Sequence, residues 1–231
     1  MDLQLKLEDG LFHYRGGCSD LIIFRSVHDN NEYKVTPEDI KDKTVIDIGA
    51  HIGSFTRLAL RMGAKKVIAV EASPMNYEYL IRNTKEYKNC ITINAAVGIF
   101  ENKFTYLIEP EDPANTGGRS ARFDYTTGDL VVMTVMFDDI FRICGECHLM
   151  KIDCEGSEFD ILCGESIRQI HKIVGEYHES ETRKVTELME RLEGMRFSTK
   201  YSPLGPYSYK TAEGDKKMSM VGHFEGVSRS L

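Results

Sequence analysis

The chain has 231 residues, of which 42% are hydrophobic and 28% are charged. This length and composition are typical of a globular protein with one α/β domain, or with one domain and a short N-terminal addition. The formal net charge of −7, without a stripe of basic residues, argues against nucleic acid as a partner. We expect no membrane partner either, because no apolar run approaches the roughly 20 residues of a spanning helix.

The cysteines and the N-terminus together predict a cytoplasmic protein with reduced thiols. Residues 1–5 lack the charged-then-apolar layout of a secretory signal. The Cys144-Gly-Glu-Cys147-His148 segment matches the short pattern of c-type haem attachment, and a zinc site would need a second pair of ligands. We interpret the segment as a loop and the start of a strand. The six cysteines are Cys18, Cys90, Cys144, Cys147, Cys154 and Cys163.

Residues 1–43 are predicted to form an N-terminal extension of short strands and one helix. Turn-forming residues separate three apolar stretches, which we interpret as strands at 12–14, 21–27 and 33–35. Thr36-Pro37-Glu38-Asp39 has the features of a helix start, with an N-cap, a proline at the first helical position and acids in the first turn.

From Thr44 onward, strands alternate with helices, which predicts a domain over residues 44–231. Right-handed crossovers then give a mostly parallel sheet with helices on both faces, and the tail suggests an antiparallel edge. The expected strands are 45–48, 67–70, 91–97, 149–152 and 173–177, followed by extended stretches at 196–201, 207–211 and 218–224 around a polar turn at 210–217. The expected helices are 55–62, 73–87 and 185–192.

Residues 101–130 interrupt this alternation. The segment contains prolines and glycines and has no clear strand or helix period. A long loop in a compact domain is usually functional. We therefore interpret it as a lid or a substrate-selecting loop.

The strongest local motif is the strand, glycine turn and helix start at residues 45–53. Asp47 precedes the turn, which contains Gly49 and Gly53. In an open parallel sheet, ligands bind beyond the carboxyl ends of the strands, so this turn should face a cofactor. A dinucleotide site would need a glycine where His51 stands, and an acid two residues before Gly49 would lie badly near a pyrophosphate. S-adenosylmethionine (SAM), which carries a sulfonium and an ammonium but no phosphate, suits the motif better.

Acidic residues end two further strands. Glu71 can accept hydrogen bonds from a ribose diol, although a solvated strand-end acid would look the same. Asp153 and Glu155 follow the strand 149–152, which should lie beside the first strand, so both carboxylates should face the cleft. The alternative is that they cap the following helix.

Together these segments resemble the FkbM family of SAM-dependent methyltransferases. The matching strings are VIDIGAHIGSFT (45–56), VIAVEASP (67–74), NAAVG (94–98), NTGGRS (115–120), a Phe-Asp-Asp turn (137–139) and MKIDCEGSEFDIL (150–162). The resemblance implies a class I, Rossmann-like fold with a seven-stranded sheet, SAM at the ends of strands one, two and four, and methyl transfer to an oxygen, often on a sugar, polyketide or other small metabolite. The family often has Asn where His51 stands.

The resemblance also assigns roles to individual residues. Asp47, Gly49 and Gly53 would line the methionine end of SAM, Glu71 would bind the ribose, and Asp153 would lie near the sulfonium methyl. Ala95 and Ala96 would lie near the adenine. The predicted cofactor-binding residues are thus Asp47, Gly49, His51, Gly53, Glu71, Ala72, Asn94, Ala95, Ala96 and Asp153.

The predicted reaction is methyl transfer from SAM to a hydroxyl oxygen of a small molecule or sugar. The acceptor proton needs a base, and the candidate catalytic residues are Asp153, Glu155 and His178, the last because it follows the strand 173–177 and is neutral near pH 7 at its ordinary pKa. No metal is predicted, because no His/Asp cluster has ligand spacing. The alternatives are a non-catalytic SAM-binding module and an NAD-linked oxidoreductase. Carboxylate, amine and protein acceptors also stay open.

Overall fold

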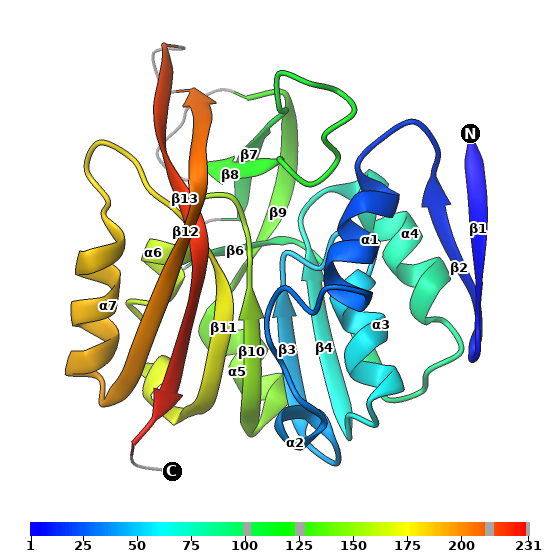
Figure 1. Ribbon diagram of the computed structural model, residues 1–231, viewed down its shortest axis with the longest axis horizontal. Coiled ribbons are helices and arrows are strands. Elements are labelled where there is room, and N and C mark those ends of the chain that lie inside the picture. The colour runs from blue at the N-terminus through cyan, green and yellow to red at the C-terminus, as the bar shows by residue number, and fades with distance from the viewer. Residues whose placement is uncertain (99–102, 123–127, 211–214, 230–231) are drawn as a thin grey trace.

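A seven-stranded sheet forms the centre of the molecule (Figure 1). The computed structural model describes residues 1–98, 103–122, 128–210 and 215–229. The strand order is β12-β13-β11-β10-β3-β4-β5. The last five strands are parallel to one another, and β13 runs antiparallel to both of its neighbours, β11 and the edge strand β12. The predicted mostly parallel sheet with an antiparallel edge is confirmed. The strands are β3 (Thr44–Ile48), β4 (Lys66–Glu71), β5 (Cys90–Asn94), β10 (Cys147–Ile152), β11 (Ile170–His178), β12 (Phe197–Lys210) and β13 (Lys216–Ser228).

Helices cover both faces of this sheet because its strands are apolar on both sides. Successive side chains of a strand point to opposite faces, so Val45 and Ile46 belong to different cores. Val45 packs with α2 (Pro37–Ile40) and α3 (Ser54–Arg61), on the face that α4 (Pro74–Thr84) also covers. Ile46 lies on the opposite face of the sheet, in the core that is covered by α5 (Phe137–Cys144), α6 (Glu158–Ile161) and α7 (Val185–Gly194). A short 3₁₀ helix, η1 (Glu165–Gln169), precedes β11.

The N-terminal extension is partly different from the prediction. The antiparallel strands β1 (Asp2–Leu7) and β2 (Gly10–Arg15) form a hairpin, and β2 contains the predicted strand 12–14. The predicted strand 21–27 is wrong, because these residues form the helix α1 (Asp20–His28), and the predicted strand 33–35 is a turn with Lys34 at φ +52°. The boundary between residues 43 and 44 stays a prediction.

Tertiary packing explains why α1 is a helix despite its β-branched residues. Phe24 and Val27, three positions apart, are buried, whereas Ile22 is 72% exposed. A strand would have placed alternate residues on the core side, but α1 packs along α3 and needs a three-to-four-residue spacing. The contacts with α3 therefore override the local strand propensity.

The region after β5 forms a second sheet rather than a long loop. The predicted strand 91–97 breaks at Ala95, where β5 ends and β6 (Ala96–Gly98) joins a sheet of order β6-β9-β7-β8. The prediction of an unstructured 101–130 segment is therefore wrong in part, and its residues 101–102 and 123–127 lie outside the description. The predicted turn 137–139 is instead the first turn of α5. The new strands are β7 (Phe104–Ile108), β8 (Ser120–Arg122) and β9 (Leu130–Met136).

The tail forms the long antiparallel pair β12–β13. Residues 197–201 and 207–210 of the two predicted stretches belong to one strand, β12, whose register with β13 shifts between Pro203 and Gly205, and residue 211 lies outside the described residues. Part of the predicted turn 210–217 lies outside the described residues. All six cysteines are free thiols; Cys144 ends α5 and Cys147 begins β10. Within the described residues, no helix has the length and apolarity needed to cross a membrane.

Candidate functional site

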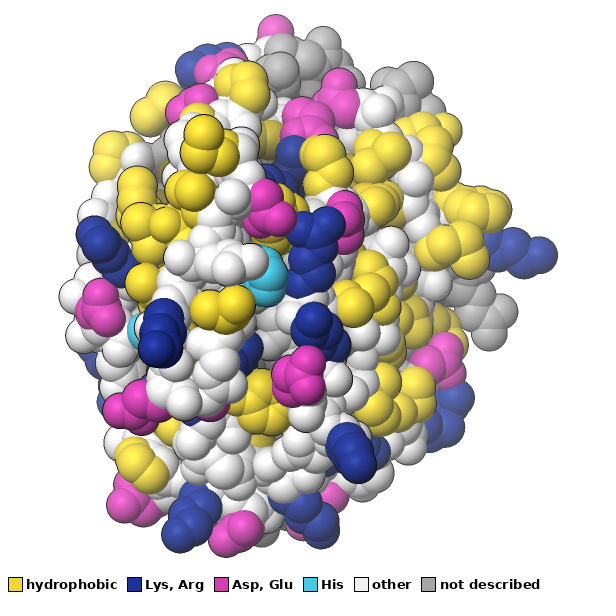
Figure 2. All heavy atoms as spheres, turned by 90° about the vertical axis from the view of Figure 1, so that its right-hand side faces the viewer, with side chains coloured by type: hydrophobic (Ala, Val, Ile, Leu, Met, Phe, Trp, Pro, Cys, Tyr) yellow, Lys and Arg dark blue, Asp and Glu magenta, His cyan; other side chains and the backbone are white. Residues whose placement is uncertain are grey.

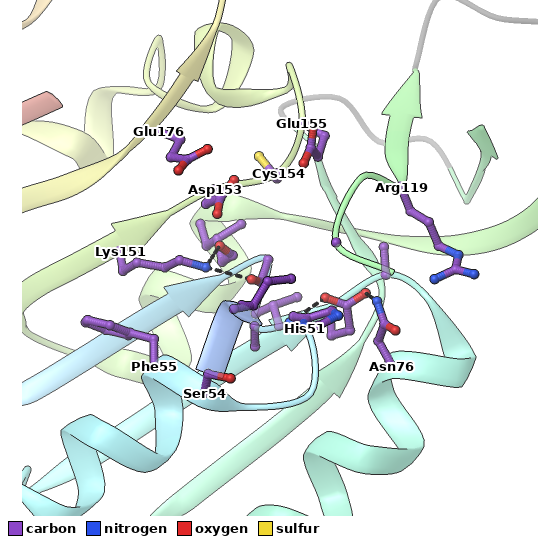
Figure 3. Close-up of a pocket in the computed structure, with 18 of the residues that line it drawn as sticks. His51, Ser54, Phe55, Asn76, Arg119, Lys151, Asp153, Cys154, Glu155 and Glu176 are labelled. Carbon is purple, nitrogen blue, oxygen red and sulfur yellow. Dashed lines mark hydrogen bonds between the residues drawn. The ribbon is translucent and has the colours of Figure 1, made fainter. Parts of the chain in front are cut away.

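A cavity of about 280 Å³ lies beyond the carboxyl ends of β3, β4 and β10 (Figure 3). It gathers most of the residues that the sequence predicts to bind the cofactor: Gly49, His51, Glu71, Ala72, Ala95, Ala96 and Asp153. The N-terminal extension supplies part of its wall through Ile22, Glu32 and Tyr33. This position agrees with the rule that open parallel sheets bind ligands at the carboxyl ends of their strands.

The turn after β3 brings its backbone against the end of β10. Gly49 has φ +73°, and a Cβ atom at this position would lie 1.7 Å from the carbonyl oxygen of Asp153. Only a residue without a side chain permits this approach. The same close packing lets Lys151 donate to the Gly49 carbonyl at 2.6 Å, as Figure 3 shows.

Glu71, at the end of β4, is held by the backbone of neighbouring turns. Its Oε2 accepts from the N–H of His51 at 2.8 Å and its Oε1 from the N–H of Ser73 at 2.8 Å. Burial raises the pKa of Glu71, and these two N–H groups oppose that rise. The carboxylate is thus fixed in orientation at the cavity wall, where it can accept further hydrogen bonds from a ligand diol.

His51 joins the cofactor cavity to the N-terminal extension. Its Nε2 lies 3.0 Å from Oγ1 of Thr116, whose hydroxyl donates to Asp20 at 2.6 Å. Because that proton goes to Asp20, Nε2 of His51 must be the donor toward Thr116, so Nδ1 carries a lone pair. Burial lowers the pKa of His51 to about 4, which keeps the ring neutral at pH 7.

Three predicted cofactor residues do not line this cavity. The carboxylate of Asp47 is fully buried, accepts from Thr56 at 2.6 Å and forms an ion pair with Lys151 at 3.3 Å. Gly53 is the N-cap of α3. The side chain of Asn94 donates to the backbone carbonyls of Glu71 and Ala72 and so supports the turn from outside the cavity.

Two of the predicted catalytic residues, Asp153 and Glu155, line one end of the cavity, and His178 lies next to Glu155. Nε2 of His178 lies 3.2 Å from Glu155, and Asp153 accepts a hydrogen bond from the hydroxyl of Tyr33 at 2.9 Å. Burial raises the pKa of Glu155 to about 7. Burial alone would lower the pKa of His178, but the carboxylates of Glu155 and Glu158 raise it well above its usual value. These two carboxylates therefore favour the protonated imidazole, whereas the sequence-based expectation of a neutral ring assumes the ordinary pKa.

A second cavity, of about 430 Å³, opens beside the first. The two cavities share Asn115, Glu155 and Glu176. His178 and Tyr207 form one wall of the second cavity, and residues of the segment 108–120 form the other. A ligand in the second cavity would therefore touch the same carboxylates as a ligand in the first.

Comparison with known proteins identifies the chain's family. The model of the methyltransferase FkbM domain matches residues 47–198. The chain belongs to the FkbM methyltransferase family. It is a SAM-dependent methyltransferase, which decides against the NAD-linked alternative. A search of curated proteins found no match.

A solved structure with a TM-score above 0.5 shows that the FkbM protein has the class I methyltransferase fold. The fibrillarin pre-rRNA processing protein of Methanococcus jannaschii is 14% identical, with a TM-score of 0.51 over 100% of this chain and 84% of the other. The precorrin-6y C5,15-methyltransferase of Geobacter metallireducens is 13% identical, with a TM-score of 0.47 over 93% and 92% of the two chains. At such identities the likeness concerns the fold alone.

The residues of this FkbM protein fit SAM as its cofactor. Nδ1 of His51 and Oγ of Ser54 are buried in the cavity without a hydrogen-bond partner among the described residues. Unpaired buried polar atoms are costly, so they indicate a polar ligand. An ammonium or ribose hydroxyl can donate to Nδ1 of His51, and the carboxylate of Glu71 can accept hydrogen bonds from the ribose diol.

Sequence reasoning missed several residues of the FkbM site. Glu158 and Thr116 stand inside strings quoted for the resemblance, but their partners are 20 and 65 residues away in the chain. Glu176 could have been found, because it lies two positions before His178 on one strand and so shares its side of the sheet. Tyr33 and Asp20 have no such signal, because the sequence predicts strands in the extension and no contact between it and the sheet.

Proposed function

We propose that this FkbM protein transfers the methyl group of SAM to a hydroxyl oxygen of a small molecule or sugar. The observation that carries the proposal is the second cavity, which adjoins the cofactor cavity at Glu155 and Glu176. An acceptor in the second cavity would place a hydroxyl at the junction, next to Asp153. Two joined cavities with a shared polar junction suit a two-substrate transfer.

The chain's own residues would position the acceptor and remove its proton. When bound, SAM supplies a methyl group on a sulfonium, which is a good leaving group, so much of the catalysis lies in alignment. Asp153, Glu155 and His178 surround the junction together with Glu176, and they are the sequence-predicted groups within reach of an acceptor hydroxyl. Proton removal by a positioned side chain contributes about 10²–10⁴-fold to such reactions.

The segment 109–119 is proposed to select the acceptor, in the role expected of a lid. Gly117 and Arg119 line the cofactor cavity, Pro110 and Gly118 line the second cavity, and Asn115 lines both. The segment is anchored at Thr116, which bonds to Asp20 and His51. A change in its tip should therefore alter the acceptor cavity while the anchor keeps the cofactor cavity intact.

The charge of the second cavity favours an uncharged acceptor with several hydroxyl groups. Its lining includes five carboxylates, which would repel a phosphate or carboxylate group: Glu109, Glu111, Asp112, Glu155 and Glu176. The named function of fibrillarin in pre-rRNA processing keeps RNA as the alternative acceptor. Against RNA, basic side chains are interspersed with acidic ones on the face in Figure 2 rather than gathered in a stripe.

The test is an acceptor screen with SAM. The purified protein is incubated with neutral sugars, polyketide alcohols and short RNAs, and each mixture is assayed for S-adenosylhomocysteine and for a product heavier by one methylene. Methylated hydroxyl groups on a sugar or small alcohol support the proposal, whereas methylated RNA overturns it. SAM binding without turnover on any acceptor would favour the non-catalytic module.

The base assignment has its own test in single variants. Asp153→Asn and His178→Ala should each lower kcat, by about 10²-fold or more for whichever residue takes part in proton removal. SAM affinity is measured in parallel by calorimetry, so that lost binding is not mistaken for lost chemistry. If both variants keep near-normal turnover with SAM bound, neither residue serves the reaction.

A further inference from the structure

Three clusters of His and carboxylate ligand atoms occur among the described residues, each with its atoms within 4.8 Å of one another. The sequence predicted no metal site, because none of these sets is close together in the chain. One cluster, formed by Asp153, Glu176 and His178, lies where the cofactor and acceptor cavities meet. Figure 3 shows Asp153 and Glu176 from neighbouring strands pointing toward this junction.

The imidazole of His178 is oriented as metal-ligating histidines are. Nδ1 lies 3.2 Å from Oε1 of the fully buried Glu158. The N–H of Cys154 donates to Oε1 of this carboxylate and the N–H of Gly156 donates to Oε2, at 2.9 Å each. The carboxylate of Glu158, held by these two N–H groups, accepts a hydrogen bond from the Nδ1–H of His178 and thereby directs Nε2 toward the junction. Metal-ligating histidines almost always donate their other N–H in this way.

The two carboxylates of the cluster are each positioned through one oxygen. Oε1 of Glu176 lies 3.0 Å from Nε2 of His223, while its Oε2 is 3.7 Å from Nε2 of His178. Oδ2 of Asp153 accepts from the hydroxyl of Tyr33 at 2.9 Å, which leaves Oδ1 for another ligand. All three side chains thus have an outer partner that fixes their orientation, as ligands of bound metals do.

Spacing and charge at the junction both suit a divalent cation. Two ligands about 2.1 Å from an octahedral ion lie about 3 Å apart when adjacent and about 4.2 Å apart when opposite, a range that includes the 3.7 Å between Nε2 of His178 and Oε2 of Glu176. Three carboxylates, those of Asp153, Glu155 and Glu176, converge there. The nearby cation Lys151 is committed to Asp47 and the Gly49 carbonyl. A divalent ion that displaced the Nε2 proton of His178 would balance the negative charge of these carboxylates.

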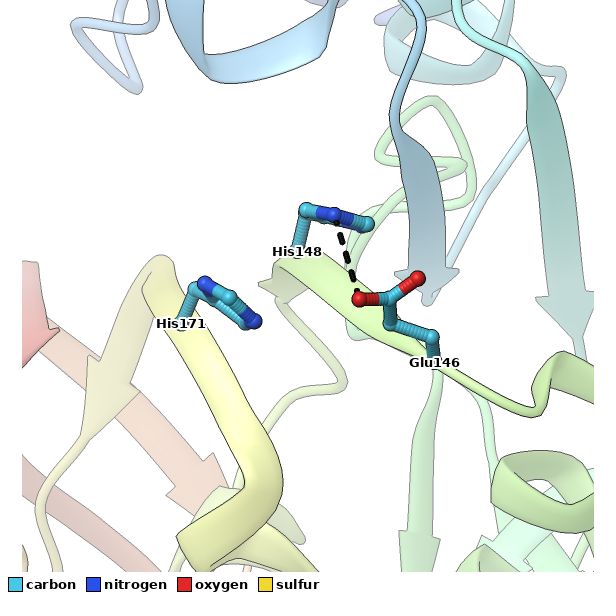
Figure 4. A group of neighbouring side chains, drawn as sticks. All are labelled: Glu146, His148 and His171. Carbon is cyan, nitrogen blue, oxygen red and sulfur yellow. Dashed lines mark ion pairs between the residues drawn. The ribbon is translucent and has the colours of Figure 1, made fainter. Parts of the chain in front are cut away.

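The cluster of Glu146, His148 and His171 offers a contrast (Figure 4). The backbone N–H of Thr44 lies 3.3 Å from Nδ1 of His148 and donates to it. A neutral ring then carries its proton on Nε2, which faces Glu146 at 3.5 Å and cannot ligate a metal there. This cluster also lies at the amino ends of β10 and β11, away from both cavities. It therefore serves as a control.

We propose that Asp153, Glu176 and His178 bind one hard divalent cation, such as Mn²⁺ or Mg²⁺, which takes the acceptor hydroxyl as a further ligand. Carboxylate and imidazole donors in an oxygen-rich site favour this class of ion. The part about the acceptor rests on the proposed function. In the transfer, the acceptor oxygen forms a bond to the methyl carbon, and the carbon–sulfur bond of SAM breaks with its electron pair staying on sulfur. The hydroxyl proton passes to Glu155, because the other two candidate bases, Asp153 and His178, hold the ion.

The test measures metal binding directly. The full-length, tag-free protein is stripped with a chelator and titrated with Mn²⁺, with free Mn²⁺ followed by electron paramagnetic resonance. We expect one Mn²⁺ per chain, with affinity lowered at least tenfold in His178→Ala and in the nearly isosteric Glu176→Gln, and unchanged in His148→Ala. Calorimetry with SAM on each variant shows that the cofactor cavity is still folded.

Absence of saturable Mn²⁺ binding up to millimolar concentration overturns the proposal. So does binding that survives both His178→Ala and Glu176→Gln, or that is lost only in His148→Ala. Failure of the proposed function is a separate result, in which Mn²⁺ binds with the expected pattern but no hydroxyl acceptor is methylated. Methylation that continues at full rate in the chelated protein overturns the role of the ion in the reaction.

Discussion

Replacing Gly49 with alanine should damage both the fold and the cofactor site, and Gly145 provides a matched control. Both glycines have similar positive φ angles, +73° and +78°, and Gly145 has ψ −43°, so alanine is strained at either position by about 1–3 kcal/mol. They differ in their surroundings. A Cβ at Gly49 would lie 1.7 Å from the carbonyl oxygen of Asp153, whereas a Cβ at Gly145 would meet nothing within 4 Å.

The extra cost at Gly49 follows from this contact. Carbon–oxygen contacts usually begin at about 3.3 Å, so the ends of β3 and β10 would have to separate by about 1.5 Å. Overpacking of this kind adds about 1–3 kcal/mol to the strain. Gly49→Ala should therefore lower the free energy of unfolding by about 2–6 kcal/mol, against about 1–3 kcal/mol for Gly145→Ala.

Urea denaturation of both variants measures the difference, and calorimetry measures SAM affinity. Gly49→Ala should also weaken SAM binding, because the displaced Asp153 backbone borders the cavity. Gly145, at the end of α5, is outside the cofactor cavity and should leave the affinity unchanged. Equal losses of stability in the two variants, or normal SAM affinity in Gly49→Ala, would refute the reasoning.

Three further predictions concern the cofactor cavity and the acceptor segment. Glu71→Ala should weaken SAM binding by about 10²-fold in calorimetry, because the ribose would lose a buried acceptor that two N–H groups hold in place. Glu78→Ala, on the exposed face of α4, should leave SAM affinity unchanged. The pKa of His51 is about 4 in the folded protein and about 6.5 in the unfolded chain, so protonation favours unfolding. The free energy of unfolding should therefore fall by up to about 3 kcal/mol as the pH drops from 6.5 to 4. Urea melts of His51→Asn should show a flatter dependence of stability on pH in that window, and parallel dependences for the variant and the unchanged protein would contradict this. Removing residues 111–113 should raise the acceptor KM and spare SAM affinity; loss of folding, seen by circular dichroism, would show that the tip is structural.

The sequence by itself determined the central βα unit and its ligand-facing turn. Val45 and its neighbours are apolar on both sides, and Gly49 marks the left-handed turn, so the signals for strand and turn are local. The order of the acids Glu71 and Asp153 along the chain also places them at strand ends, where a parallel sheet brings them to one edge. These features need no knowledge of distant contacts.

Only the tertiary structure decided how the extension and the acidic junction are built. The residues of α1 have strand propensity, and their burial against α3 makes them helical. Tyr33 reaches Asp153 across 120 positions of the chain, and Thr116 reaches Asp20 across 96. Such pairs depend on how the crossovers fold back on the sheet, and no local period or spacing encodes them. The raised pKa of His178 is decided in the same way, since it follows from carboxylates that converge only in the folded chain.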